Sequence, residues 1–187
     1  MRKIFYSLEN LFFAWVLLFC PLLTSCSSEN SLFQDDEDEA PPLSEAEQAR
    51  LDKLLIGKWK DSNRAMIFHK GVPVRIHNEG TRRYFADHTA SVVGLITISS
   101  VATGSMTFRY DIASKWGIWG GHYHETVSSF DCKTIRADDA DAARTFHQFS
   151  RASIGQTSTF LPITVTEQYL AMRNLENDVL MSLDRIQ

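Results

Sequence analysis

The residue with the most distinctive chemistry in this chain is Cys26, which directly follows the small pair Thr24-Ser25 at the end of an apolar run. The basic pair Arg2-Lys3 precedes that run, which covers residues 11–23. A basic start, an apolar run and small residues before a cysteine are typical of an export signal that ends in a lipobox. The pattern predicts that residues 1–25 are a signal peptide. Cys26 then becomes the first residue of a bacterial lipoprotein, acylated with chains such as palmitate.

The apolar run has two other interpretations. It could stay in the membrane as an uncleaved anchor, or the ordinary signal peptidase could cut near Ser25 and release a soluble periplasmic protein. A transmembrane helix needs about 20 consecutive apolar residues, whereas this run is shorter and holds Pro21 near its end. Cleavage and acylation are therefore favoured. Ser27 follows Cys26 in place of the aspartate that often retains such lipoproteins at the inner membrane, and this resemblance favours the outer membrane.

Two histidines and one cysteine are the other candidates for chemistry. His122 and His124 lie two residues apart on an expected strand, so they share a face and could supply two metal ligands. Zinc needs three or four ligands, and no spacing offers a third. We therefore expect no metal site and no cofactor. Cys132 is the one thiol of the predicted mature domain, and we expect an inert, buried thiol rather than a reactive one.

The sequence carries no recognisable catalytic motif. Hydrolysis needs an activated nucleophile, and the sequence has neither a Gly-x-Ser-x-Gly motif nor a cysteine and histidine in a recognisable catalytic context. It also lacks a Gly-rich phosphate loop. We therefore expect no catalytic residues and no enzymatic activity.

A set of large side chains forms the candidate binding site. Met106, Phe108 and Tyr110 alternate with polar residues, so they share one face of a strand, and Trp116 follows them. In a hollow barrel these four residues would line the site of a small apolar ligand. The alternative is that they fill a packed core. Trp119 lies three residues after Trp116 and therefore faces the opposite side of a regular strand, where it could cover an interface.

Charge is distributed unevenly along the chain, whose net charge is -4. Of the 23 acidic residues, seven precede residue 40: Glu9, Glu29 and the run 35–39. Arg2 and Lys3 are the only basic residues before position 43. Residues 43–187 thus hold 16 acidic and 17 basic side chains, with no basic stripe that would favour nucleic acid as a partner. Residues 26–42 are acidic and rich in serine and proline, so we expect a disordered tether.

Residues 43–187 suit a single domain, which must position all these candidates. Ser44 and Glu47 form a capping box before a short helix that ends near Gly57. A second helix is expected after Asp138, up to about Arg151. Strands are expected, from composition and alternation, at residues 58–61, 65–68, 74–77, 83–85, 89–98, 106–112, 116–119, 122–127, 169–173 and 179–185.

These short strands and the tight turns between them favour a closed or nearly closed antiparallel barrel, because closure removes exposed sheet edges. Gly120-Gly121 supplies the positive φ angles of one such turn. Trp59 is expected to close one end of the barrel, with Arg185 or Arg173 stacked on its ring.

Four motifs resemble lipocalins and the bacterial lipocalin-like lipoproteins. They are Leu55-Ile56-Gly57-Lys58-Trp59, the turn at 84–89, Trp116-Gly117-Ile118 and the final segment 175–183. His88 stands where those domains usually have glycine. The resemblance implies a mostly β chain that forms a small lipocalin-like up-and-down barrel with one or two short helices. It names no ligand, since one fold carries many functions.

The order of motifs is also similar to that of ToxS-type periplasmic proteins, which pair with membrane-bound transcription activators. Two hypotheses therefore stay open. In the first, the barrel binds a small apolar ligand while lipid anchors it in the envelope. In the second, an exposed strand edge or Trp119 docks an envelope protein.

Overall fold

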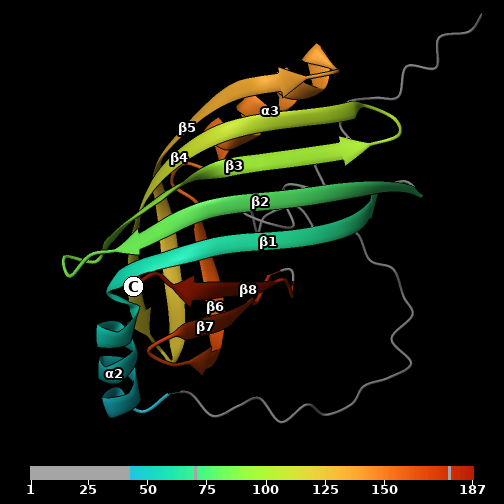
Figure 1. Cartoon of the computed structure of the whole chain (residues 1–187). Helices are drawn as coiled ribbons and strands as arrows, with labels where there is room; N and C mark the ends of the chain where they lie inside the picture. The colour runs from blue at the N-terminus through green and yellow to red at the C-terminus, as the bar shows by residue number, and fades with distance from the viewer. Residues whose placement is uncertain (1–42, 70, 177) are drawn as a thin grey trace, which may run out of the picture.

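The computed structural model describes residues 43–187 apart from Lys70 and Asn177. These residues form a closed barrel of eight antiparallel strands, each paired with the next along the chain and the last with the first (Figure 1). The elements are α2 (Glu45–Leu55), β1 (Gly57–His69), β2 (Val72–Tyr84), β3 (Thr89–Ser100), β4 (Gly104–Trp119), β5 (His122–Ala137), α3 (Ala140–Ala152), β6 (Thr157–Val165), β7 (Tyr169–Asn174) and β8 (Leu180–Arg185).

The predicted fold class is confirmed: the described residues form a mostly β, up-and-down antiparallel barrel with two helices, the architecture found in lipocalins. The predicted signal peptide at 1–25, Cys26 and the tether at 26–42 lie outside the described residues.

Several strand predictions differ from the structure. The segments predicted at 74–77 and 83–85 belong to one strand, β2, those at 106–112 and 116–119 belong to β4, and β5 continues past 127 to Ala137. Residues 58–61 and 65–68 were expected as separate strands, but β1 is continuous through the polar stretch at 62–64. The reason is that Asn63 faces inward, where it donates a hydrogen bond to Asp61, so alternation continues with polar groups on the inside. The strand β6 was not predicted. Its register shifts between Pro162 and Thr164, and this irregularity interrupts the alternation on which a sequence prediction depends.

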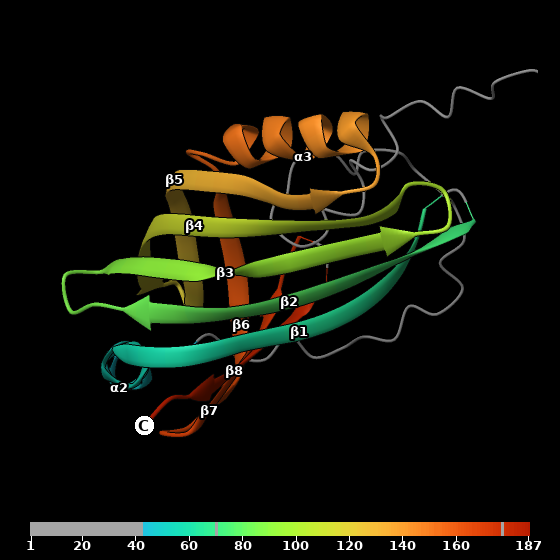
Figure 2. The same cartoon turned by 45° about the horizontal axis from the view of Figure 1, so that its top comes forward.

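The strands have unequal lengths, and this shapes the interior. β1 pairs with β8 only from Trp59 to Asp61, and β5 pairs with β6 only from Tyr123 to Thr126. Past these pairs β1–β5 continue, and we call this part the extended sheet. The helix α3 runs alongside β5 there (Figure 2), and Phe146 stacks on Phe108 with ring centroids 4.1 Å apart. The short strands thus close one end of the barrel only.

Buried apolar side chains form two separate groups. The closed-end core consists of Leu51, Leu55, Trp59, Tyr84, Ala90, Trp116, Tyr123, Phe160, Leu170, Met172 and Leu183. The extended-sheet core consists of Val74, Ile76, Val92, Ile96, Ile98, Met106, Phe108, Tyr110, Ile112, Phe130, Ala142, Ala143 and Phe146. The interior between these two cores holds polar side chains.

The helix α2 covers the closed end (Figure 1). Its capping box forms as predicted, because the Ser44 hydroxyl accepts from the amide of Glu47 and the Glu47 carboxylate accepts from the amide of Ser44. Leu51 and Leu55 are its buried residues. Within the described part of the chain, neither helix has the length and apolar character needed to cross a bilayer.

Trp59 closes this end of the barrel as predicted, and its partner is Arg185. The Arg185 guanidinium lies 4.4 Å from the centroid of the Trp59 ring and donates hydrogen bonds to the carbonyls of Leu54 and Ile56, at the C-terminus of α2. A Cβ on Gly57 would lie 2.6 Å from Arg185 Nη1, so the Gly-x-Trp motif leaves room for the arginine.

Two tight turns lie at the closed end. Gly120 and Gly121 both have positive φ, as predicted for the β4–β5 turn. His88 also has a positive φ of 61°, although it is not glycine. Its ring packs edge-on against Trp116 with centroids 4.7 Å apart, and its Nε2 lies 2.9 Å from Asp52 Oδ1. These contacts offset the cost of the left-handed backbone and join the turn to α2.

We expect Arg185→Ala to lower the free energy of unfolding by about 2 kcal/mol, because it removes a cation–π contact and charge-assisted hydrogen bonds to the end of α2. Urea titration followed by circular dichroism measures this loss. The control is Arg173→Ala on β7, since the side chains of its ion pair with Asp178 are 37% and 83% exposed, and this pair should contribute less than about 1 kcal/mol. Equal losses in both variants would contradict this role of Arg185.

Candidate functional site

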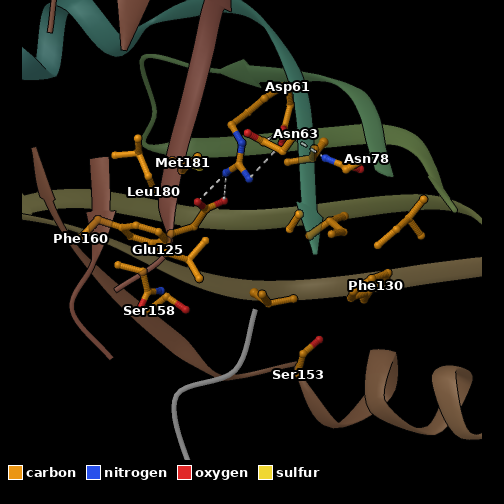
Figure 3. A pocket seen from close by; sticks show the side chains of 18 of the residues that line it. Asp61, Asn63, Asn78, Glu125, Phe130, Ser153, Ser158, Phe160, Leu180 and Met181 are labelled. Carbon is orange, nitrogen blue, oxygen red and sulfur yellow. Dashed lines mark hydrogen bonds and ion pairs between the residues drawn. The ribbon is translucent and has the colours of Figure 1, made fainter. Parts of the chain in front are cut away.

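A cavity of about 140 Å³ lies between the two cores (Figure 3). Its polar floor includes Asp61 and Asn63 of β1, Arg82 of β2 and Glu125 of β5. Its apolar wall comes from the extended sheet and includes Val92, Ile96, Ile112 and Phe130. Leu180 and Met181 of β8 line it on another side. A cavity of this kind can surround a small molecule that has both an apolar and a polar part.

The polar floor consists of inward-facing positions on the strands. Asp61 follows buried Trp59 by two residues, Arg82 precedes buried Tyr84 by two, and Glu125 follows buried Tyr123 by two. Alternation therefore directs all three charged side chains inward. They meet at the level where β8 and β6 stop pairing with β1 and β5. The three charged side chains thus lie at the boundary between the closed-end core and the cavity.

Arg82 and Glu125 form the centre of this network. Arg82 Nη1 donates to Glu125 Oε1 at 2.7 Å and to Oε2 at 2.5 Å, and both side chains are almost completely buried. Ser114 Oγ also donates to Oε1 at 2.6 Å, and the Tyr123 hydroxyl donates to Oε2 at 2.8 Å. Such charge-assisted bonds compensate for the removal of the two charges from water.

The two tyrosines beside this pair stay protonated. Burial, with the nearby Glu125 carboxylate, raises the pKa of Tyr123 well above its ordinary value. Burial also raises the pKa of Tyr84 to about 12. The oxygens of the two hydroxyls are 3.2 Å apart. Both groups act as neutral hydrogen-bonding partners of the network at physiological pH.

Asp61 has a different environment from Glu125. Its Oδ1 accepts from Asn63 Nδ2 at 2.6 Å and from Asn78 Nδ2 at 3.1 Å, while Asn78 Oδ1 accepts from the Tyr110 hydroxyl at 2.6 Å. The nearest cationic contact of Oδ2 is Arg82 Nη2, at 3.9 Å. Burial raises the pKa of Asp61 more strongly than Arg82 and the two amides lower it. A carboxyl group with a perturbed pKa in a cavity is a candidate for function.

Arg82 keeps a free donor in this arrangement. Its Nε is buried and has no hydrogen-bond partner. Burial lowers the pKa of Arg82, but Glu125 and the other neighbours raise it well above its ordinary value, so the guanidinium stays charged. In Figure 3, Asp61, Asn63 and Asn78 lie together on one side of the cavity, with Glu125 below them.

The four predicted ligand-binding residues lie near the cavity without lining it. Met106 and Phe108 belong to the extended-sheet core, and Trp116 belongs to the closed-end core, where its Nε1 donates to the Thr89 carbonyl at 2.9 Å. Tyr110 reaches the cavity floor only through Asn78. None of these four residues is among those that line the cavity. A ligand role for these four stays a prediction.

The residues that sequence reasoning missed are Asp61, Arg82 and Glu125. The available signal was a charged residue at an inward position of an alternating strand, next to an aromatic residue two positions away. That pattern indicates a buried charge, which needs a partner. It does not show which strand supplies the partner.

The histidine pair and the thiol have ordinary environments. His124 stacks on Trp119 with ring centroids 3.8 Å apart, and its ring centroid lies 6.3 Å from that of His122. Trp119 is exposed while Trp116 is buried, as their spacing predicts. No three metal-binding side chains come together in the described ranges. Burial raises the pKa of Cys132 to about 11, which favours the inert thiol.

No family model matches the chain, and no curated protein matches it. The fold and the site geometry therefore carry the functional argument.

We expect Glu125→Gln to lower the free energy of unfolding by about 3 to 5 kcal/mol, because it leaves the buried Arg82 charge without its close counterion. The double variant Arg82→Gln, Glu125→Gln should be less destabilised than this single variant, since it removes both charges. Denaturant unfolding of the two variants tests this. Glu79→Gln, at an exposed position of β2, is the control and should change stability little. A loss below about 1 kcal/mol for Glu125→Gln would rule out the pair as an essential contact.

Proposed function

We propose that this protein is a lipid-anchored envelope protein whose barrel binds a small ligand in the cavity between its two cores. The observation that carries the proposal is the cavity itself, which has an apolar wall and a charged floor. Barrels of about eight strands are either filled by side chains or hold one small ligand, and this barrel has space inside. The fold is compatible with ligand binding, and the cavity supports the proposal.

The cavity size limits the ligand. Its volume of about 140 Å³ is close to that of an apolar cavity of about 150 Å³ that takes up benzene in another protein. The ligand, or the part of it held inside, is thus about as large as a single ring. Haem and bile salts are too large to be enclosed by it.

The charges also favour a binding role. Replacing a buried ion pair by apolar residues is often neutral or stabilising, so a barrel selected for stability alone has no need of Arg82, Glu125 and Asp61 in its interior. A binding role is favoured over catalysis, because the Glu125 carboxylate already accepts from Arg82, Ser114 and Tyr123 and is not a free base.

The anchor completes the proposal. Acylation at Cys26 would attach the barrel to a membrane, with the outer membrane favoured over the inner one. One acyl chain binds a bilayer only marginally, whereas the two or three chains of a bacterial lipoprotein hold stably. The support for this part is the sequence pattern around Cys26.

A protein-docking role is the second candidate, and the edge of β1 favours it. Past Asp61 this strand pairs with β2 on one side and with no described strand on the other. Met66 and Phe68 in that stretch are 60% and 71% exposed. An unpaired strand edge with exposed apolar side chains can accept a strand from a partner. If this alternative is correct, crosslinking in the native envelope should attach one dominant protein partner to the edge of β1 past Asp61.

We expect Val92→Phe to abolish binding of small ligands, because the larger side chain fills the cavity. The measurement is the thermal shift caused by a panel of compounds of benzene size, including benzyl alcohol, in wild type and variant. Val93→Phe is the matched control, since Val93 lies on the same strand but faces outward and is exposed. The proposal fails if no compound raises the melting temperature of the wild type. It also fails if Val92→Phe binds as well as Val93→Phe.

We expect Cys26→Ser to prevent acylation and to move the protein from the membrane fraction to the soluble fraction or to an unprocessed form. Mass spectrometry of the N-terminal peptide and fractionation of expressing bacteria measure these two effects. Cys20→Ser, within the predicted signal peptide, is the control and should leave both acylation and membrane attachment unchanged. An unmodified Cys26 in the wild-type protein would refute the lipid anchor.

A further inference from the structure

The charges on the cavity floor are unequal: two carboxylates, Asp61 and Glu125, face one guanidinium, Arg82. On this basis, and assuming the proposed ligand-binding function, we propose that the ligand is a small organic amine. Its ammonium group binds Asp61 Oδ2, and its apolar body lies against Val92, Ile96 and Phe130.

Arg82 is already paired with Glu125. Its Nη1 lies 2.5 Å and 2.7 Å from the two oxygens of Glu125, whereas its Nη2 lies 3.9 Å from Asp61 Oδ2. Coulomb energy falls with distance, so Glu125 neutralises most of the guanidinium charge. Asp61 is the carboxylate that lacks a close cation.

Asp61 has one carboxylate oxygen that can accept from a ligand. Both of its hydrogen bonds, from Asn63 and Asn78, go to Oδ1. Oδ2 accepts none, and it lies on the cavity floor. Asn63 uses its amide nitrogen on Asp61, which leaves Asn63 Oδ1 as a second acceptor beside it (Figure 3). An ammonium group has three donors and no acceptor, so it matches two such oxygens.

An anionic head group does not fit this floor. A ligand carboxylate would meet both Asp61 and Glu125, and Arg82, the buried cation of the floor among the described residues, is held by Glu125. Arg64 also lines the cavity, but its side chain is exposed on the rim, where solvent screens its charge.

The groups around Asp61 also favour an ammonium group beside its carboxylate. The charged or titratable groups that act on it are Arg82 from β2, Glu125 from β5 and the Tyr110 hydroxyl of β4, which contacts it through Asn78. Burial dominates, and it raises the pKa of Asp61. An ammonium group in contact with Oδ2 would offset this cost, because an opposite charge within about 4 to 6 Å favours the ionised carboxylate.

Three probes of similar size test the head group: benzylamine, benzyl alcohol and benzoate. Calorimetric titration of the full protein in detergent measures their affinities, and Val92→Phe in the same detergent gives the background. We expect benzylamine to bind at least about tenfold more tightly than benzoate, as a charge-assisted contact allows. Asp61→Asn should lose about tenfold of the benzylamine affinity and leave that for benzyl alcohol unchanged. Asp184→Asn, at an exposed position of β8, is the control.

The possible outcomes separate this inference from the proposed function. If benzyl alcohol or benzoate binds as tightly as benzylamine or more tightly, the cavity binds ligands but the amine preference is wrong. If Asp61→Asn folds, by circular dichroism, and keeps full benzylamine affinity, the assignment to Asp61 is wrong. If Asp61→Asn does not fold, the order of the three probes on the wild type decides. If no probe binds the wild type above the Val92→Phe background, both proposals fall.

Discussion

The contact on which the interior depends is the buried ion pair of Arg82 with Glu125. It joins β2 to β5 across the barrel, between residues 43 positions apart in the chain. Two charges without partners in this interior would cost more than a domain of this size can offset. The hydroxyls of Ser114 and Tyr123 complete the coordination of the carboxylate. The position of this pair separates the closed-end core from the extended-sheet core, so it also fixes the floor of the cavity.

The unequal strand lengths explain why the space lies on one side of this pair only. On the closed side, β6–β8, the helix α2 and the Trp59–Arg185 stack fill and cover the barrel. On the other side β6 and β8 no longer pair with their neighbours, while β1–β5 continue with α3 beside β5. Space is thus left where an apolar wall meets a charged floor. The same geometry leaves part of the β1 edge without a partner strand among the described residues, which is why the cavity and this strand edge occur next to each other.

The chemistry of the cavity suits recognition better than storage of an apolar molecule. A purely apolar ligand would leave Asp61 Oδ2 without a hydrogen-bond donor in a low-dielectric interior, which is costly. A ligand with a donor satisfies this oxygen, and its affinity then depends on where that donor is placed. A lipid anchor at Cys26 would hold such a binding protein at a membrane surface.

The sequence by itself determined the mostly β class, the capping box at Ser44, the turn at Gly120-Gly121 and the inward face of most strands, because these depend on residues close together in the chain. The proposal of an anchor at Cys26 also rests on local pattern alone. The sequence did not reveal that β1 continues through Asn63, that β6 exists with its irregularity at Pro162, or that Asp61, Arg82 and Glu125 meet. Alternation tells which side of a strand a residue faces, but not which distant strand lies opposite. Only the closed barrel brought these charges together, since partner choice depends on the register and curvature of the whole sheet.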